Sequence, residues 1–370
     1  MPDGALQMTL LLGATTPTPA PVRFVDALIS AEVQSSYIGA DAFQVTFALA
    51  KDSLIDYSLL RDELLMPPNR LCLVVRFGVR PEVLVDGMIT HHQVQPSNRP
   101  GDTVLVVSGD DISTRLALAD RTTSYPERTD SDIVTEVLRR YLTLGLRTDI
   151  ERTTSKPGKN DPHRVQTGTD LEFIRGLARA NGFVFSIDPT ATPGTSTAYW
   201  GPEDRRTRQD PQLTMNMGAA TNVDRPITFS FNAMRPVKPV LSAVRSPESS
   251  APVQAPDLPG PRLVRRPTEP LRTVGLYDTG GLTLEEAKLR ALEARVESAD
   301  AVTAIGQLDT ARYGTLLRAG RRVTVRGVGA SYNGDYLIRR VTSELRRGTA
   351  TQHFVLGREG LGALGGGGSR

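Results

Sequence analysis

Short stretches of alternating apolar and polar residues dominate the chain from Val22 to Asp111. Four of them are rich in Val, Leu and Phe and are bounded by turn-forming residues: AFQVTFALA (42–50), RLCLVVRF (70–77), EVLVDGMIT (82–90) and DTVLVVSG (102–109). A period of two between such boundaries is typical of β-strands. The pattern predicts an all-β region, a small barrel or sandwich, with one short helix in DYSLLRDELLMPPN that ends at Pro67 and Pro68.

The spacing becomes helical between residues 130 and 200. In SDIVTEVLRRYLTLGL the apolar positions recur at helical intervals up to Gly145: Ile133, Val134, Val137, Leu138, Tyr141 and Leu142. A glycine just past the last apolar position is a common helix end. The segment therefore predicts one helix, followed by the polar loop ERTTSKPGKNDPHR.

The segment TGTDLEFIRGLARANGFVFSID (167–188) predicts a capped helix that leads directly into a strand. Thr169 and Glu172 have capping-box spacing, in which each side chain accepts a hydrogen bond from the other residue's backbone amide. Gly182 suits the left-handed turn at the helix end. The apolar positions form a helix stripe and then a strand: Leu171, Ile174, Leu177 and Ala178, then Phe183, Val184, Phe185 and Ile187. We expect a compact α/β subdomain here.

The last third of the chain predicts a linker, a helix and more strands. Residues 245–270 are dense in Pro and Ser and are expected to form no regular element. LTLEEAKLRALEARVESADA predicts a helix with Leu289, Leu292, Val296 and Ala299 on one side. The final strands are RRVTVRGVG, GDYLIRRVTSEL and TATQHFVLGRE, and a flexible tail, GALGGGGSR, follows them.

The two β regions resemble each other. NRLCLVVRFGV, EVLVDGMITHHQV and GDTVLVVSGDD correspond to GRRVTVRGVG, SYNGDYLIRRV and TATQHFVLGRE, with Gly87 and Gly334 near the start of each middle strand. The alternative is that any two three-stranded meanders look alike. If the repeat is real, a trimer of this chain would present six similar units around its axis and could join a hexameric ring to a trimeric partner.

Length, charge and cysteine content narrow the class of protein. A chain of 370 residues is expected to form two or three domains. Residues 1–120 carry 8 basic and 14 acidic side chains, so the remaining 250 residues hold a basic excess. The basic residues are scattered without interleaved aromatic residues, which argues against nucleic-acid binding. Cys72 lies in an apolar run and is expected to be a buried free thiol.

Targeting signals are weak in this sequence. Its first residues show neither a basic segment nor a convincing apolar core of a signal peptide, and no apolar run approaches a membrane span. We therefore expect folding in the cytoplasm and no insertion into a membrane.

The sequence contains no recognisable pattern of catalytic or metal-binding side chains. His91 and His92 are adjacent and would point to opposite faces of a strand, and His163 and His353 are isolated. The chain has no GxSxG motif and no phosphate-binding loop. Its adjacent carboxylates suit turns and a first helical turn better than an acid/base pair: Asp110 with Asp111 and Glu285 with Glu286. We predict no catalytic residue, metal ligand or cofactor site.

Two motifs resemble the phage late control D protein family, which includes the baseplate hub of contractile phages and the N-terminal hub region of VgrG proteins. The first is TGTDLEFIRGLARANGFVF. The second is LLRAGRRVTVRGVGASYNGDYLIRRVTSELRRGTATQHFVLGR, in which Gly320, Gly327, Gly329, Gly334, Tyr336 and Val341 fall where the family has them. The likeness extends over roughly residues 20–360. VgrG chains continue into further spike domains, whereas this sequence ends in GGGGSR.

The resemblance implies an α+β, mainly β chain with two related tube-like β-barrel domains that flank a small α/β subdomain. We accordingly expect barrels at 1–120 and 211–362, the subdomain at 121–210 and a tail at 363–370. The resemblance also implies a non-enzymatic homotrimer in a phage tail or injection particle. Its expected partners are a hexameric inner tube protein, a trimeric spike protein and other baseplate components.

Two other functions remain open at this point. One is a tail-tip enzyme that degrades peptidoglycan or surface polysaccharide. The other is a β-rich receptor-binding module, which would need an aromatic-lined concave face. An aromatic content of 5% and a single tryptophan, Trp200, make the second less attractive.

Overall fold

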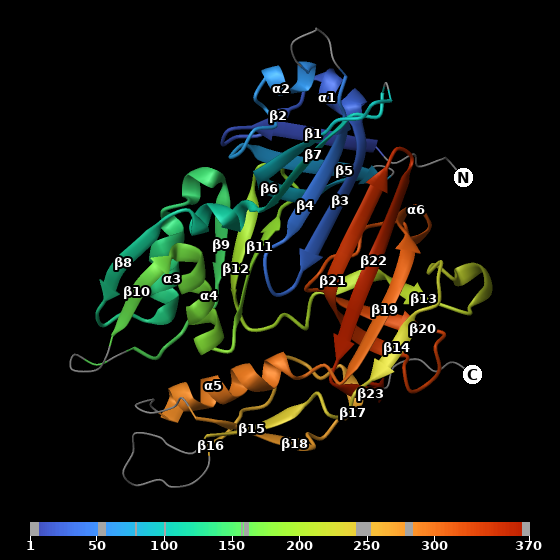
Figure 1. Cartoon of the computed structure of the whole chain (residues 1–370). Helices are drawn as coiled ribbons and strands as arrows, with labels where there is room; N and C mark the ends of the chain where they lie inside the picture. The colour runs from blue at the N-terminus through green and yellow to red at the C-terminus, as the bar shows by residue number, and fades with distance from the viewer. Residues whose placement is uncertain are drawn as a thin grey trace.

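The chain is mainly β, with helices beside the strands (Figure 1), as expected from its sequence. The computed structural model describes residues 7–50, 57–77, 80–99, 101–156, 158, 163–241, 253–277 and 284–364. Most of the tail predicted at 363–370 lies outside these residues. No helix in the described part of the chain has the length and apolar character to cross a membrane.

One sheet of thirteen strands organises the molecule. The strands that belong to it come from both ends of the sequence: β1 (Gln7–Gly13), β2 (Thr18–Pro19), β3 (Leu28–Ser36), β4 (Ala42–Ala48), β5 (Arg70–Phe77), β6 (Arg80–Gln95), β7 (Val104–Asp111), β13 (Arg208–Thr214), β14 (Thr228–Phe231), β19 (Val302–Asp309), β20 (Arg322–Arg326), β21 (Gly334–Arg346) and β22 (Thr349–Arg358). The four predicted N-terminal strands correspond to β4, β5, β6 and β7. The three predicted C-terminal strands are β20, β21 and β22.

The predicted repeat is present in the order of the strands. The N-terminal half runs β1-β5-β6-β7-β4-β3, and the C-terminal half runs β13-β20-β21-β22-β19-β14. In each half the central meander is antiparallel, and its middle strand bulges against the strand that follows it, at Thr90 in β6 and at Arg339 in β21. β6 has a further bulge against β5, at Leu84. The outer strands differ in one respect, because β1 is antiparallel to β5 whereas β13 is parallel to β20.

The two halves are joined by strand pairing. Residues 30–36 of β3 pair antiparallel with residues 340–346 of β21, so the sheet continues from one half into the other. Figure 1 shows β3 and β21 side by side in the middle of the sheet. Among the described residues, strand pairing closes neither half into a barrel.

Each half has its own apolar core on the inner face of the sheet. Alternate residues of β3, β4 and β7 point inward, and Phe24 and Leu59 cover this core from α1 (Val22–Ala27) and α2 (Ser58–Arg61). The second core gathers around Phe354 and Tyr336, beside α6 (Thr310–Tyr313). Cys72 is fully buried, as predicted.

The central subdomain is the predicted α/β unit. It contains η1 (Ile112–Ala117), β8 (Asp120–Tyr125), α3 (Asp130–Arg139), η2 (Leu142–Leu144), β9 (Leu146–Ile150), β10 (Arg164–Thr169), α4 (Asp170–Ala180), β11 (Val184–Pro189) and β12 (Ser196–Gly201). Both halves of the Thr169–Glu172 capping box are made, and Leu171, Ile174 and Leu177 are buried. The predicted helix start and docking stripe are therefore confirmed as geometry.

One predicted helix is shorter than expected. The helix over 130–145 ends at Arg139, and a 3-10 turn follows whose C-cap is Gly145. Leu142 is consequently exposed. The change from an α-helix to a 3-10 turn rotates it away from the apolar stripe to which Ile133 and Leu138 belong. The short helix predicted before Pro67 is also reduced, to the four residues of α2.

The region after residue 236 folds into a small unit whose helix was predicted but whose strands were not. Its strands are β15 (Val237–Leu241), β16 (Val253–Gln254) and β18 (Arg272–Leu276), and α5 (Leu284–Glu297) packs on them. β17 (Val264–Pro267) pairs with β23 (Gly360–Ala363) near the end of the described chain. The expectation that 245–270 forms no regular element is therefore wrong for its described part, although residues 242–252 lie outside it.

The buried side of α5 also differs from the prediction. Ala287 and Ala291 are fully buried, whereas Leu289, Leu292 and Val296 are half-buried, and Ala299 lies beyond the helix end. Small residues let the helix approach β15 closely. Leu292 contacts the neighbouring subdomain instead, where it lies against Gly182.

We predict that replacing Leu177 with Asp will destabilise the central subdomain. The side chain is 4% exposed in an apolar core, so an unpaired carboxylate there should lower the free energy of unfolding by about 3–5 kcal/mol. Urea unfolding measures this directly. The exposed Arg179→Asp variant of the same helix should lose less than about 1 kcal/mol. If Leu177→Asp unfolds like the parent, the packing role of this stripe is wrong.

Candidate assembly surface

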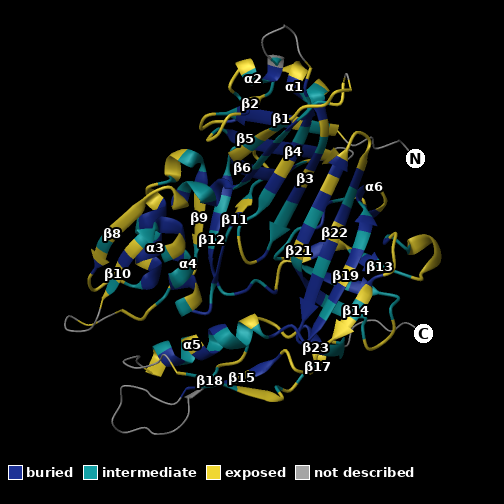
Figure 2. Cartoon of the chain, in the orientation of Figure 1, coloured by how far each residue is buried: buried dark blue, intermediate teal, exposed yellow. Residues whose placement is uncertain are grey.

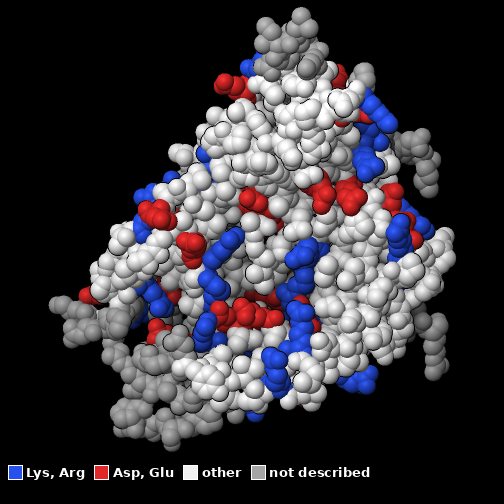
Figure 3. All heavy atoms as spheres, viewed as in Figure 1, with Lys and Arg blue, Asp and Glu red and all other residues white. Residues whose placement is uncertain are grey.

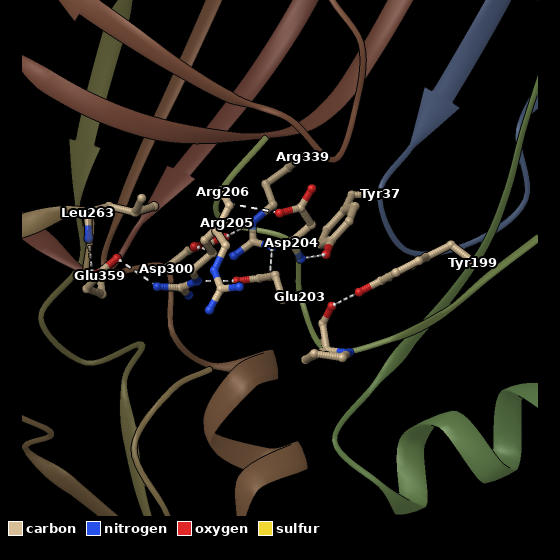
Figure 4. Close-up of polar contacts among 11 residues, drawn as sticks. Tyr37, Tyr199, Glu203, Asp204, Arg205, Arg206, Leu263, Asp300, Arg339 and Glu359 are labelled. Atoms are coloured by element: carbon tan, nitrogen blue, oxygen red, sulfur yellow. Dashed lines mark hydrogen bonds and ion pairs between the residues drawn. The ribbon is translucent and has the colours of Figure 1, made fainter. Parts of the chain in front are cut away.

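A buried ion network lies where the two halves of the sheet meet. Arg339, at the bulge of β21, donates two hydrogen bonds to Asp300, from Nε at 2.6 Å and from Nη2 at 2.7 Å, and it also pairs with Glu203. Figure 4 shows these side chains pointing toward one another from different segments. The bulge is what frees Arg339 from the alternation of the strand, so its side chain can turn toward these acids.

The network extends to the C-terminal end of the sheet. Glu203 also accepts a hydrogen bond from Arg205 Nε at 2.6 Å, and Arg205 Nη1 lies 3.3 Å from Glu359. Glu359 in turn accepts the backbone N–H of Leu263 at 2.7 Å. Arg205 and Glu203 are at most 3% exposed, so they cannot exchange these partners for water. The chain after β12, the chain before β17 and the end of β22 are thereby fixed to one another.

Tyr37 completes the joint from the N-terminal half. Its backbone N–H donates to the carbonyl of Arg339 at 2.9 Å, and its hydroxyl accepts the backbone N–H of Asp204 at 2.7 Å. Gly320 packs against its ring: φ is +79°, and an added Cβ would lie 2.7 Å from the aromatic carbon. Any larger residue at position 320 would therefore push Tyr37 out of the joint.

The neighbouring charges of this network shift the pKa values of Glu203 and Arg339. Burial alone would raise the pKa of Glu203, but the guanidinium groups of Arg339 and Arg205 hold the pKa below its ordinary value. Burial opposes the charge on Arg339, and the neighbouring Glu203 and Asp300 overcome it and raise the pKa of the guanidinium. Glu203 and Arg339 are therefore both ionised at neutral pH.

A second buried pair attaches the central subdomain to the N-terminal half. Arg70 on β5 forms a bidentate pair with Asp86 on β6, at 2.6 and 2.7 Å, and both are at most 3% exposed. Arg70 also donates to the backbone carbonyls of Thr15 and Leu144, while Ser196 of β12 lies 3.3 Å from Asp86. The central subdomain is therefore attached to the sheet through contacts with a buried ion pair.

The outer face of the sheet is polar along most of its strands. Alternate positions of β3, β4, β7, β19, β21 and β22 are partly or fully exposed (Figure 2), and most carry small or neutral side chains: Gln34, Gln44, Thr46, Ser108, Thr303, Gln307, Thr342 and Thr351. In Figure 3 the charged side chains gather in a band above α5, and much of the surface beside it is uncharged. Such a face suits water better than a second apolar layer.

The seam between the halves brings two acidic side chains of this face together. Glu32 on β3 is directly opposite Glu344 on β21, and Glu344 lies 3.4 Å from His353 Nε2. Like charges opposite each other weaken a strand pair by fractions of a kcal/mol. The pairing of β3 with β21 therefore depends on backbone hydrogen bonds and on the ion network behind it, not on the side chains of the outer face.

The cavities formed by the described residues (7–50, 57–77 and 80–364 with their gaps) show no catalytic arrangement of side chains. A cavity of about 410 Å³ lies between the sheet and the central subdomain, and its charged groups pair across the joint: Arg318 donates to Glu82 and to the carbonyl of Val83. Within the described ranges, no three His, Cys, Asp or Glu side chains gather as a metal site would require. His91 is exposed and His92 half-buried on β6.

Solved structures share this architecture over nearly the whole chain. A tail protein from Neisseria meningitidis superposes with a TM-score of 0.62 at 15% identity, covering 97% of this chain and 98% of that one. The 43 kDa tail protein of prophage MuSo2 from Shewanella oneidensis gives 0.64 at 14% identity, with 96% and 99% covered. The chain has the fold of phage tail proteins.

The same fold also occurs in a secretion system. An Escherichia coli protein described as a component of the type VI secretion system, with structural similarity to the T4 bacteriophage tail proteins gp27 and gp5, gives a TM-score of 0.55 at 14% identity. That match covers 95% of this chain and 76% of the E. coli chain. The resemblance to late control D and VgrG proteins is thus confirmed together with the mainly β, α+β fold class, whereas the two-barrel arrangement stays a prediction.

The sequence comparisons add one partial match. The family model described as the Alg8 N-terminal domain matches residues 44–193, which is less than half of the chain. The matched segment begins inside β4 and ends between the paired strands β11 and β12, so it cuts across two cores of this tail-protein fold. No curated protein sequence matches the chain.

The two sequence motifs lie in different cores. Leu171, Ile174 and Leu177 belong to the core of the central subdomain, whereas Tyr336 belongs to the core of the C-terminal half. Phe183 packs edge-on against Trp200 with ring centroids 4.8 Å apart. The five glycines predicted as motif residues all adopt positive φ: Gly182, Gly320, Gly327, Gly329 and Gly334. Gly182 and Gly320 pack against Leu292 and Tyr37, where each joins two parts of the fold.

The residues that hold the tail-protein fold together were not among those predicted. Arg339, Glu203, Arg205 and Asp300 come from segments far apart in the sequence, so no spacing links them. One local signal exists: in LIRRV two apolar residues precede two arginines, which breaks the period of two and is typical of a bulge.

We predict that Arg339→Met will be strongly destabilising. Removal of the guanidinium leaves Glu203 and Asp300 buried with fewer counter-charges, which typically costs about 3–5 kcal/mol. Arg340→Met is the matched control, because Arg340 is the next residue on β21 and is exposed. The control should change the free energy of unfolding by less than about 0.5 kcal/mol. Equal losses in the two variants would contradict the role of Arg339.

The lowered pKa of Glu203 predicts an acid-sensitive contribution to stability. A carboxyl whose folded pKa lies below its unfolded value, about 4.5, stabilises the fold above that pH, and the contribution disappears as the pH falls through the folded pKa. Glu203→Gln should therefore be less stable than the parent at pH 7, and the difference should shrink as the pH falls below 4.5. Urea unfolding at a series of pH values measures this, and a constant difference would contradict the assignment.

Proposed function

We propose that this chain is a structural baseplate hub, a homotrimer that joins a hexameric inner tube to a trimeric spike in a phage tail or contractile injection system. In this role it carries out no catalysis. Its work is to present one set of contacts with sixfold spacing and another with threefold symmetry.

The repeated strand order is the observation that carries this proposal. Six strands in the N-terminal half and six in the C-terminal half follow the same order, and the middle strand of each half bulges at the equivalent point. A trimer of such chains would contain six similar halves around one axis, so a sixfold partner could contact each half in nearly the same way. We propose that each half, at about 1–120 and 211–362, becomes one tube-like unit of this ring.

The polar outer face supports a position beside a water-filled passage. Its side chains are mostly neutral, so a hydrated cargo would meet few strong charges there. The central subdomain and the unit containing α5 lie to one side of the sheet (Figure 1) and would brace the ring. The tail proteins and the type VI component with the same fold agree with such a setting.

The partners follow from this placement. The hexameric inner tube protein would contact the six halves, the trimeric spike protein would bind on the threefold side, and other baseplate components would surround the hub. In this proposal the chain folds in the cytoplasm and then enters the particle.

We predict that the chain assembles in threes. Native mass measurement of the purified chain, alone or co-expressed with the products of neighbouring reading frames, should give a species of three times 40.1 kDa, or that species with a spike bound. A stable monomer that gains no partner in either sample would contradict the proposed function.

A further inference from the structure

Two neighbouring hollows lie where α4, α5 and the turn between β3 and β4 meet (Figure 1). The first has a volume of about 330 Å³, and much of its lining is apolar: Ala178, Phe183, Val184 and Phe185. The second has a volume of about 310 Å³ and is lined partly by the end of the C-terminal half of the sheet. Both hollows are also lined by Ile38, Val296 and Glu297, which therefore lie between them.

The size and exposure of the two hollows suit apolar side chains of a partner. Ile38 is 59% exposed, and Phe183 and Val296 are only half-buried, so a single chain leaves apolar surface in water here. Pockets that bind small ligands start at about 300 Å³, so each hollow is at the small end of that range. Two such hollows on either side of Ile38 favour a polypeptide segment with two apolar side chains over one small molecule.

Unpaired arginines flank the hollows. Arg175 and Arg179 line the first hollow from α4, one helical turn apart, where like charges weaken a helix. Arg235 and Arg340 line the second hollow, and both are exposed. Among the described residues, none of these four guanidinium groups makes an ion pair or a hydrogen bond. Acidic groups of a partner would offset the repulsion between them.

The acidic side chains near the hollows have partners, with one exception. Glu293 pairs with Arg290, Glu172 belongs to the capping box of α4, and Asp300 belongs to the buried ion network. Glu297 is exposed and makes no ion pair within the described ranges. Figure 3 shows basic side chains on both sides of acidic ones in the band above α5. The hollows therefore present unpaired positive charge at both ends and one unpaired carboxylate in the middle.

We propose that the two hollows bind a segment of another protein in which two apolar side chains are flanked at both ends by acidic residues. The apolar side chains would fill the hollows on either side of Ile38. Acidic residues at one end would face Arg175 and Arg179, and charge-assisted hydrogen bonds could form there. Those at the other end would face Arg235 and Arg340. Because all these residues belong to a single chain, such binding does not depend on the proposed hub function.

A segment of protein fits the hollows better than a nucleic acid does. Phosphates would meet the arginines but leave the apolar hollows empty, and Glu297 would repel them. A polypeptide can fill both hollows and place a neutral or basic residue opposite Glu297.

Selection from a displayed peptide library tests the chemistry of the partner. The probe is a yeast-displayed library of peptides of about ten residues, in which Leu, Phe, Asp, Lys, Ser and Gly are equally frequent at every position. The purified, labelled chain should retain peptides enriched in apolar residues and in Asp, with Asp towards the ends and Lys depleted. One retained peptide is then synthesised with a fluorescent label, and its Kd for the chain is measured by fluorescence anisotropy.

Three variants test the place of binding. Ile38→Asp puts a negative charge between the hollows. Two double variants reverse the charge at either end: Arg175→Glu with Arg179→Glu, and Arg235→Glu with Arg340→Glu. Each variant should raise the Kd about tenfold or more, because it places like charges beside the acidic residues of the peptide.

The matched controls lie on other surfaces of the chain. Leu118 is exposed to the same extent as Ile38, 59%, and Arg139 is an exposed arginine of α3. Leu118→Asp and Arg139→Glu should leave the Kd within about twofold of the parent value. Every variant should unfold near the urea midpoint of the parent, so that a loss of binding is not a loss of fold.

Retention of no peptide, or of acidic peptides without apolar residues, would contradict the proposal. A Kd that the three variants leave unchanged would contradict it as well. If Ile38→Asp changes the native mass and the parent chain retains no peptide, the hollows lie between copies, so the proposed partner is wrong while the hub function stands. A chain that stays monomeric in every sample but binds the selected peptide through these residues supports the partner and overturns the hub function.

Discussion

The pairing of β3 with β21 is the contact on which the architecture depends. It turns two six-stranded halves, separated in the sequence by the 96 residues from 112 to 207, into one sheet. Its side chains on the polar face contribute little, since Glu32 opposes Glu344. The backbone ladder and the buried ions behind it therefore stabilise the joint, and Arg339 takes part in both: its carbonyl accepts from Tyr37 and its guanidinium binds Glu203 and Asp300.

The other parts of the chain are arranged around this joint. The central subdomain has its own core and is connected to the N-terminal half through the Arg70–Asp86 pair. The loop that leaves β12 carries Glu203 and Arg205 into the ion network, so the same segment that ends the subdomain also fixes the C-terminal half. Charges buried in this way contribute modest net stability but define one relative orientation, because any other arrangement would leave them unpaired.

Local patterns in the sequence were sufficient to predict the helices and strands. They were not sufficient to predict the contacts that connect these elements. The Thr169–Glu172 capping box, the stripe ending at Leu177 and the three-stranded repeat follow from spacing, and the structure contains them. The ion network does not follow from spacing, because its members are distant in sequence. The unit containing α5 was misjudged for a related reason: its proline-rich strands are short, and Ala287 and Ala291 fill the buried side in place of larger residues.

The central claim is that one chain contains two equivalent halves of a ring. Electron-microscopic class averages of the assembled particle, viewed along its axis, test this most directly. The account predicts threefold symmetry of the whole particle together with a strong sixfold component in the ring formed by the sheets. An assembly with a different rotational symmetry, or a threefold particle without the sixfold component, would contradict it.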